Sequence, residues 1–470
     1  MFNINISFIF LYSLSFINIV ITNSSPLILQ FETQKPSVSI NPDNYFELKY
    51  NNELKVNIKA GTHRQSIPCY LNINTHTFYI SGSNSKLINS QPKYEEFKST
   101  KYQNTSDKIT YESFYVYGMP SKDEICLNND NRVELEFYLA QSKFSSSELT
   151  HSCILGLGYE QVPFDENKEN YVDGIESFIT QIKNNNIINQ KIFFINYNNN
   201  DNGDIIFGAF PHELNRNYYG SFTEENYVEM DNSFINDIEI IWSSKGYIYV
   251  GENKLFDYLS TIEFELSQGF IIGSYNYKQN IENNFFNEKI SKNECFKREI
   301  FVDKEAFEGF YCKKNVDITK IEDLIILIDK IQYKIEFTYK DLFTELDGYL
   351  YFDVLFTQEQ DTFKNDFTLG KPFFKKYPMI FNTKERVEKI GFYNDFLEQK
   401  NRGQNDSTKK DSNSGKVSKL GIFLIIIGIC IIGLLVYISI KYFNRPRKQK
   451  VNELIEFFDY SSVQNVQKNI

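Results

Sequence analysis

Short runs of alternating apolar and polar residues recur along the first 400 residues and predict β-strands. In residues 54–60, every second residue is apolar and the residues between are lysine or asparagine, the period of a strand buried on one face. Similar runs are RVELEFYLA, KIFFINYN, DIIFGAF, GYIYVG, KIQYKIEFTY and YLYFDVLF, with turns rich in Asn, Asp and Gly between them. Helical spacing is clearest in residues 174–186. The pattern predicts a mainly β protein.

The chain begins with an apolar run, residues 6–21, which small and polar residues follow. This arrangement is typical of a secretory signal peptide cleaved near residues 23–25, so residues 1–24 are predicted to be a signal peptide. The basic residues that usually precede such a run are missing, which leaves an uncleaved membrane anchor as the alternative.

A second apolar run, residues 420–440, has 21 residues without a charge, enough for a single transmembrane helix. Five basic residues follow within positions 441–450, so the positive-inside rule places the tail, residues 441–470, in the cytosol. A lipid-anchor signal is disfavoured because the polar tail has 30 residues. The polar segment 397–418 is predicted to be a flexible stalk.

These segments predict a single-pass type I membrane protein at the cell surface or in the endomembrane or lysosomal system, with a lumenal or extracellular ectodomain. The tail segment from Tyr460 to Val463 has the form of a tyrosine sorting signal, which predicts a sorting adaptor as a partner, although such patterns also arise by chance. Asn104 and Asn405 lie in glycosylation sequons, a weak signal in a chain so rich in asparagine.

Composition and charge exclude some classes of function. The chain is 41% hydrophobic and 16% aromatic, enough for a sizeable core, and its net charge is −11. Because the basic residues of the ectodomain are dispersed, we expect no nucleic-acid partner. No cysteine or histidine spacing resembles a zinc site, and we expect neither a metal nor a cofactor.

Five of the six cysteines precede the transmembrane segment, so disulfides are expected but one thiol must stay outside them or pair between molecules. Cys295 and Cys312 are close in sequence and are expected to pair. The pairing of Cys69, Cys126 and Cys153 is left open, with at most one further bond among them.

Six stretches follow one another between roughly residues 45 and 395. They are Gly61-Thr62 with Gln65, ITYESFYVYG at 109–118, CILGLGYE at 153–160, IIFGAF at 205–210 followed by Tyr219-Gly220, the pair Cys295 and Cys312, and FTLGKPFF at 367–374 leading to Gly391-Phe392. In this order they resemble features of the pepsin family of aspartic proteases, the first a hairpin turn, the second the flap and the cysteine pair the disulfide of the C-terminal lobe.

The resemblance implies a mainly β, bilobal pepsin-like fold, here followed by the single C-terminal transmembrane helix. The N-terminal lobe would span residues 45–215 and the C-terminal lobe residues 216–396, with a substrate cleft between them. In this family each lobe supplies one Asp from an Asp-Thr-Gly or Asp-Ser-Gly turn. Two carboxylates about 3 Å apart share one proton, so one acts as general base on a water while the other polarises the scissile carbonyl.

Neither triplet occurs in this chain. In the first lobe, the family has its first acid eleven residues after the glycine of the hairpin turn, here Gly61, and seven residues before an aromatic residue, here Tyr79. Both counts reach Asn72. The triplet is then residues 72–74, and a shift by two would make it residues 74–76. Both begin with asparagine, whose amide cannot accept a proton near any working pH.

In the second lobe the stretch GFIIGSYNYK, residues 269–278, matches the pattern of two apolar residues followed by the triplet. It places Gly273 at the acid position and Ser274 after it. This alignment has one anchor, and a shift by one or two residues is the alternative.

The resemblance therefore predicts no catalytic residue, with Asn72 and Gly273 at the two acid positions. Tyr111 would lie on the flap, and Thr75 and Ser274 would line the cleft. The resulting hypothesis is a pseudopeptidase that binds a peptide or protein in the inter-lobe cleft without cutting it. The alternative is an active aspartic endopeptidase with a non-standard or differently placed pair of acids.

Overall fold

The computed structural model describes much of residues 25–392, in the ranges 25–33, 39–87, 91–105, 110–112, 116–128, 131–140, 150–158, 175–198, 201–214, 227–229, 241–302, 305–357, 367–383 and 389–392. They all fall within one compact unit, residues 1–400. The predicted signal peptide, stalk, transmembrane helix and tail lie outside these ranges, as do Asn405 and the segment from Tyr460 to Val463. None of the helices described here is long and apolar enough to cross a membrane.

The first half of the chain builds most of a 14-stranded sheet. Its order is β12-β26-β25-β10-β11-β1-β2-β3-β9-β4-β8-β7-β5, with β6 beside β7. The strands are β1 (Leu27–Thr33), β2 (Leu54–Ala60), β3 (Gln65–Asn72), β4 (Phe78–Ser81), β5 (Gln103–Asn104), β6 (Thr110–Glu112), β7 (Val116–Cys126), β8 (Arg132–Ala140), β9 (Cys153–Gly156), β10 (Ile192–Tyr197), β11 (Gly203–Phe207), β12 (Tyr227–Glu229), β25 (Met379–Asn382) and β26 (Lys389–Phe392).

The second half builds a 12-stranded sheet of order β20-β19-β13-β15-β24-β16-β23-β18-β22-β21, with β14 beside β13 and β17 beside β18. The strands are β13 (Ser243–Val250), β14 (Asn253–Lys254), β15 (Ser260–Phe264), β16 (Ile271–Gly273), β17 (Cys295–Val302), β18 (Glu305–Lys313), β19 (Leu324–Ile328), β20 (Tyr333–Phe337), β21 (Phe343–Leu346), β22 (Tyr349–Phe352), β23 (Val354–Thr357) and β24 (Phe367–Leu369).

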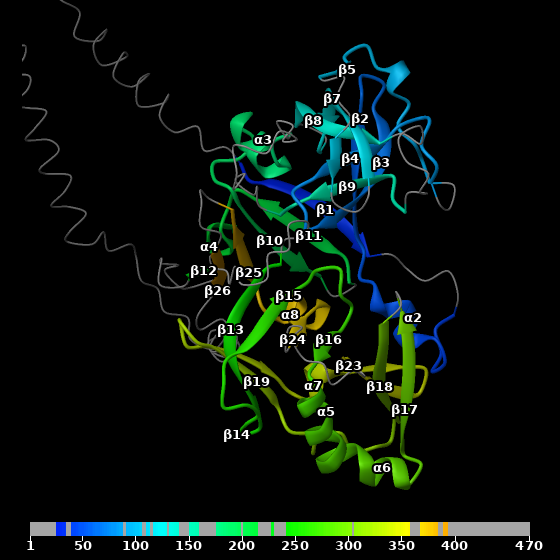
Figure 1. Cartoon of the computed structure of the whole chain (residues 1–470), viewed down its shortest axis with the longest axis vertical. Coiled ribbons are helices and arrows are strands. Elements are labelled where there is room, and N and C mark those ends of the chain that lie inside the picture. The colour runs from blue at the N-terminus through cyan, green and yellow to red at the C-terminus, as the bar shows by residue number, and fades with distance from the viewer. Residues whose placement is uncertain are drawn as a thin grey trace, which may run out of the picture. The chain divides into compact units, whose positions relative to one another are not determined.

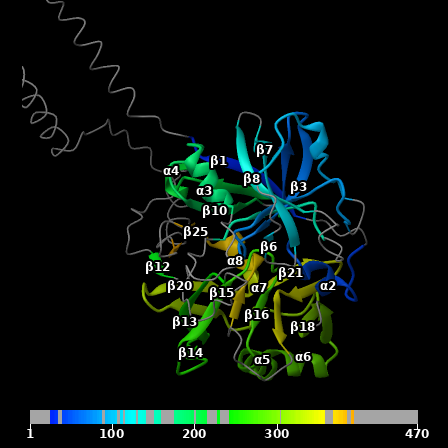
Figure 2. The same cartoon turned by 45° about the horizontal axis from the view of Figure 1, so that its top comes forward.

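The helices are short; α5 and α6 lie at one end of the second sheet, whereas α8 lies between the two sheets (Figures 1 and 2). They are α2 (Tyr45–Tyr50), η2 (Glu96–Lys98), α3 (Phe178–Asn184), α4 (Pro211–Leu214), α5 (Tyr275–Ile281), η6 (Glu282–Phe286), α6 (Asn287–Ser291), α7 (Tyr339–Leu342) and α8 (Lys371–Lys376). The mainly β prediction is thus confirmed, and α3 lies within the segment whose spacing predicted a helix.

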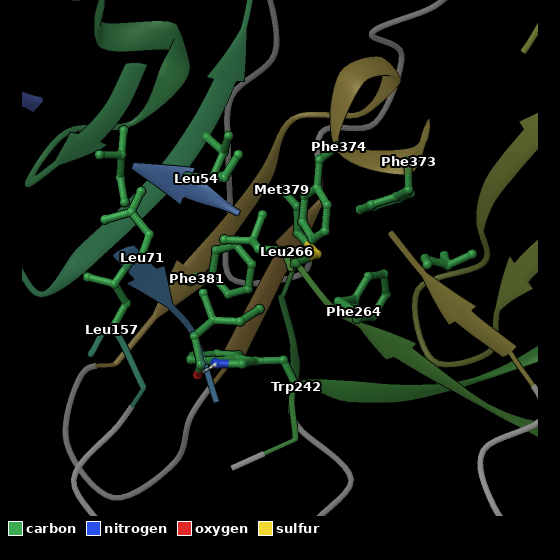
Figure 3. Close-up of a cluster of buried hydrophobic side chains, with 14 of the residues drawn as sticks. Leu54, Leu71, Leu157, Trp242, Phe264, Leu266, Phe373, Phe374, Met379 and Phe381 are labelled. Carbon is green, nitrogen blue, oxygen red and sulfur yellow. Dashed lines mark hydrogen bonds between the residues drawn. The ribbon is translucent and has the colours of Figure 1, made fainter. Parts of the chain in front are cut away.

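The end of the described chain joins the first sheet, and the two sheets share one core. β25 comes from the end of the described chain yet pairs with β10 of the first sheet, with Phe381 opposite Phe193 (Figure 1). One cluster of buried apolar side chains runs through both sheets. Figure 3 shows part of it, with Trp242 and Leu266 of the second half and Leu54 and Leu71 of the first in the same cluster. The two lobes are therefore held together by continuous apolar packing.

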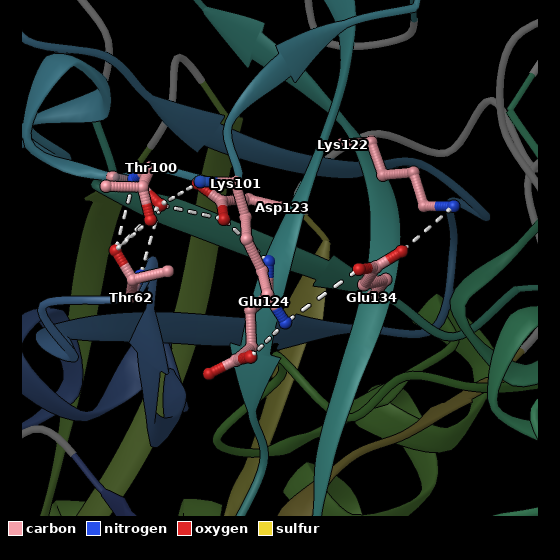
Figure 4. A network of polar contacts seen from close by, with 8 residues as sticks. Thr62, Thr100, Lys101, Lys122, Asp123, Glu124 and Glu134 are labelled. Atoms are coloured by element: carbon pink, nitrogen blue, oxygen red, sulfur yellow. Dashed lines mark hydrogen bonds and ion pairs between the residues drawn. The ribbon is translucent and has the colours of Figure 1, made fainter.

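The Gly61-Thr62 segment forms the turn between β2 and β3, as the sequence predicts. Gly61 has φ +74°, a left-handed conformation that glycine adopts without strain. A polar network fastens this turn to its neighbours: the Thr100 N–H donates to Thr62 Oγ1 at 3.1 Å, and Lys101 Nζ lies 2.7 Å from Glu124 Oε2 (Figure 4).

The described part of the chain contains two disulfides, and its remaining cysteine, Cys126, is a buried free thiol. Cys295–Cys312 joins β17 to β18, which confirms the predicted pair. Cys69–Cys153 joins β3 to β9, a pairing that the sequence left open. The two bonds close loops of very different length, with sequence separations of 84 for Cys69–Cys153 and 17 for Cys295–Cys312.

Loop length predicts a difference in stability between the two bonds. Because a longer cross-linked loop restricts the unfolded chain more, C69A/C153A is expected to lower the free energy of unfolding by about 4.5 kcal/mol and C295A/C312A by about 3 kcal/mol. Urea denaturation of the two double variants without reductant measures both. A larger loss in C295A/C312A would contradict this order.

Helix α2 belongs to the first half of the chain but packs against the second sheet. Tyr45 stacks on Tyr351 with ring centroids 3.8 Å apart. The Tyr45 hydroxyl donates to Asp353 Oδ1 at 3.0 Å, and Thr344 Oγ1 donates to Asp353 Oδ2 at 2.6 Å. Burial raises the pKa of the Asp353 carboxyl to about 6, against the lowering effect of these two hydrogen bonds.

This raised pKa predicts that Asp353→Asn stabilises the protein at neutral pH. A carboxyl whose pKa is about 6 when folded and about 4 when unfolded favours folding below pH 4, and that contribution is lost as the pH rises to 6. The amide stays neutral, so the variant should gain about 2 kcal/mol at pH 7.5 and nothing at pH 3.5. Denaturation at the two pH values tests this, and an equal change at both would contradict it.

Candidate active site

The first half of the site is the loop that follows β3 at Asn72. β9 runs parallel to β3 and antiparallel to β4, so it lies between the strands that precede and follow the loop. The Leu157 N–H donates to the Asn72 carbonyl at 2.7 Å. A Cβ at Gly156 would overlap the Thr77 carbonyl oxygen, so the close crossing of loop and strand requires glycine there. The Asn72 side-chain oxygen accepts from the Asn74 N–H at 2.7 Å.

The second sheet repeats this arrangement after β15. β24 runs parallel to β15 and antiparallel to β16, and a Cβ at Gly370 would overlap the Gln268 carbonyl oxygen. The residue after β15 is Glu265. Its Oε1 accepts from the Ser267 N–H at 2.9 Å and from the Ser267 hydroxyl at 2.7 Å. In both loops, therefore, the first side chain accepts from the N–H two residues on.

The strand register makes Glu265 the counterpart of Asn72. Leu155 of β9 lies opposite the residue before Asn72, and Leu369 of β24 lies opposite the residue before Glu265. A glycine follows each of these leucines.

The two loops meet. The Asn74 side-chain N–H donates to Glu265 Oε2. Trp242 Nε1–H donates to the Ile73 carbonyl at 2.8 Å, and the Asn52 side chain donates to the Leu266 carbonyl at 2.9 Å. One carboxylate thus faces one asparagine amide at the contact between the two lobes, and both Glu265 oxygens already accept hydrogen bonds.

The structure does not bring Gly273 to this place. Gly273 is the last residue of β16, eight residues after Glu265, and a Cβ there would lie against the rings of Tyr277 and Phe356. The assignment of Gly273 to the second acid position is therefore corrected to Glu265. The search for an Asp-containing triplet missed Glu265; the signal that was present is the apolar alternation of Ile262 and Phe264 ending on an acid.

The other predicted cleft residues have structural contacts. Thr75 is buried, and its hydroxyl accepts from the Thr77 N–H at 3.1 Å within the first loop. Ser274 caps α5, since its hydroxyl accepts from the Tyr277 N–H at 3.3 Å. The backbone of Tyr111 lies opposite Tyr117 in the β6–β7 hairpin, which confirms a hairpin at the predicted flap; its side chain lies outside the described part. Asn104 is exposed on β5.

Family comparison agrees with this geometry. The model of the eukaryotic aspartyl proteases matches residues 55–393, which include both loops and almost all of both sheets. The chain belongs to the eukaryotic aspartyl protease family. None of the curated proteins compared with it is a match. Among the side chains that the structure describes, no three His, Cys, Asp or Glu residues are grouped so as to hold a metal ion.

The mechanism of this family shows which side chains the two loops would need for catalysis. An aspartyl protease divides the work between two carboxylates that share a proton. In this chain Glu265 can accept a proton, whereas the Asn72 amide accepts a hydrogen bond from the Asn74 N–H but cannot act as a base. These two loop positions therefore carry one of the two acidic groups that the family's mechanism uses. That group, Glu265, has a side chain one methylene longer than aspartate.

Proposed function

We propose that this eukaryotic aspartyl protease family member is a membrane-anchored pseudopeptidase that binds a peptide or protein segment between its lobes without cutting it. The observation that carries the proposal is that the two equivalent loop positions hold one amide, Asn72, and one carboxylate, Glu265.

The physical argument concerns proton transfer. General acid–base catalysis needs one group to take a proton from water and another to polarise or protonate the substrate. An asparagine amide cannot hold the shared proton. Both Glu265 oxygens accept hydrogen bonds from Ser267 and Asn74, so both are engaged within the two loops.

Peptide binding is supported by the hairpin at the predicted flap and by the geometry of the two loops. β6 and β7 pair in the segment predicted to be the flap, and in both loops the first side chain accepts from the N–H two residues on. The membrane anchor rests on the sequence: the uncharged run 420–440 with its basic flank supports a type I protein of the cell surface or endomembrane system. The segment from Tyr460 to Val463 supports an adaptor as cytosolic partner.

Glu265 also supports a second candidate, an endopeptidase with one carboxylate acting as base. Glu265 lies at the acid position and accepts from the Ser267 N–H. As the general base, its carboxylate would take a proton from a water molecule bound beside it.

Cleavage assays distinguish the two candidates. The full chain in detergent micelles is expected to leave a mixed peptide library intact from pH 3 to pH 7, with no component sensitive to a pepstatin-type inhibitor, and to bind some of those peptides in fluorescence anisotropy. Glu265→Gln is the matched variant because it keeps the size of the side chain and removes the charge. Inhibitor-sensitive cleavage by the wild-type chain that Glu265→Gln abolishes would overturn the pseudopeptidase and support the endopeptidase.

A further inference from the structure

A pocket of about 790 Å³ lies apart from the two loops. Its wall is formed by helices α2, α7 and α8, strands β10 and β21, and the segment Gly269-Phe270. None of Asn72, Asn74 or Glu265 lines it. Its volume is within the range of sites that hold small organic molecules. The partly exposed apolar residues Ile40, Phe343 and Leu346 supply part of that wall.

The wall carries an excess of positive charge. Five lysines and three aspartates line the pocket, which leaves two positive charges in a chain whose net charge is −11. Two of the lysines share one acid: Lys371 Nζ lies 2.9 Å from Asp201 Oδ2, and Lys375 Nζ lies 2.7 Å from Asp201 Oδ1. Lys376 pairs with Asp341 at 2.6 Å. The third aspartate, Asp353, is held by two hydroxyls.

The excess charge comes from Lys49 and Lys340. Within the described part of the chain neither forms an ion pair with an acidic side chain, and they reach the pocket from different elements, α2 and α7. Lys49 is half-buried and Lys340 is exposed. A partly desolvated ammonium group attracts an anion more strongly than one in bulk water, because the local dielectric is lower.

We propose that this pocket binds a small organic anion with an apolar body. Its carboxylate or phosphate lies against Lys49, Lys340 and the lysines of α8, and its apolar part lies against Ile40, Phe343 and Leu346. The charge selects the anionic group, and the apolar wall selects against a bare inorganic ion.

The pocket also adjoins the loop that carries Glu265. Tyr197 lines the pocket, and its hydroxyl accepts from the Asn52 side chain at 2.8 Å. The same amide nitrogen donates to the Leu266 carbonyl at 2.9 Å. One residue therefore connects the pocket wall to the candidate active site, although the proposed ligand does not need that site in order to bind.

Isothermal titration calorimetry on the full chain in detergent tests the proposal with four probes. These are 2-naphthyl phosphate, 2-naphthoate, 2-naphthol and inorganic phosphate. We expect one saturable site per chain for 2-naphthyl phosphate, 2-naphthoate or both, and the tighter of the two identifies the preferred anionic group. We expect 2-naphthol and phosphate alone to bind at least about tenfold more weakly.

The double variant K49Q/K340Q is expected to weaken binding of the naphthyl anions about tenfold or more. Its matched control is K98Q/K292Q, which removes two exposed lysines that do not line the pocket and whose ion-pair partners, Glu95 and Glu288, do not line it either. Glu265→Gln should leave the affinity unchanged. The proposal is overturned if no naphthyl anion shows a saturable site, if 2-naphthol or phosphate binds as tightly as the anions, or if the control weakens binding as much as K49Q/K340Q.

Discussion

Replacing Trp242 by alanine is expected to lower the free energy of unfolding by about 4 kcal/mol. Trp242 is 0% exposed. Its ring packs edge-on against Phe381 at 4.9 Å and against Phe193 at 6.5 Å between centroids. The substitution removes a large buried surface and leaves a cavity where the two halves of the chain meet (Figure 3). Urea denaturation followed by circular dichroism measures the loss, because the variant has no tryptophan fluorescence.

Trp242→Phe is the control that separates packing from hydrogen bonding. Phenylalanine keeps most of the ring but leaves the Ile73 carbonyl without the indole donor, so we expect a loss of about 2 kcal/mol, clearly smaller than for alanine. If alanine costs less than about 1 kcal/mol, Trp242 does not hold the lobes together as the packing indicates.

Local features of this fold could be predicted from the sequence because they depend on neighbours along the chain. The alternation in residues 54–60 predicted a strand with one buried face, and β2 has that pattern. The turn at Gly61 needed only a residue that tolerates a positive φ. The pair Cys295 and Cys312 was expected from its short separation and lies on adjacent strands.

Contacts between distant segments could not be predicted in the same way. The pairing of β3 with β9 joins residues more than 80 positions apart, so the partner of Cys69 was left open. The position of Glu265 likewise depends on the parallel register of β15 and β24, which nothing near residue 265 encodes. A motif search requires the motif to survive, whereas strand register identifies the position even after the motif has changed.

The candidate site illustrates the same limit. Two independent counts from Gly61 and Tyr79 reached Asn72, and the structure places Asn72 at the end of β3, where its side chain accepts from the Asn74 N–H. The single count in the second half reached Gly273, eight residues beyond the equivalent position. The second half contains several short apolar strands between residues 243 and 273, so one anchor alone did not fix the position of the acid there.

Restoring aspartate at both loop positions is expected to create acid-dependent peptide cleavage. In N72D/E265D both loops keep the N–H donors of Asn74 and Ser267 that hold the first side chain. Two facing carboxylates would then share one proton. Because positioned acid–base groups contribute about 10² to 10⁴ in rate, we expect cleavage at least about a hundredfold above the wild-type background below pH 5. A quenched-fluorescence peptide library measures it, with a pepstatin-type inhibitor as the specificity check.

The matched control is N72D/E265N, which has the same two side-chain sizes and one amide in place of a carboxylate. It should stay at the wild-type background, because an aspartate opposite an amide has no partner with which to share a proton. Equal cleavage by both double variants would contradict the prediction and show that one carboxylate suffices. A folded but inactive N72D/E265D would mean that the loops have lost more than their acids, in which case the side chains around Asn74 and Leu266 prevent the carboxylates from meeting.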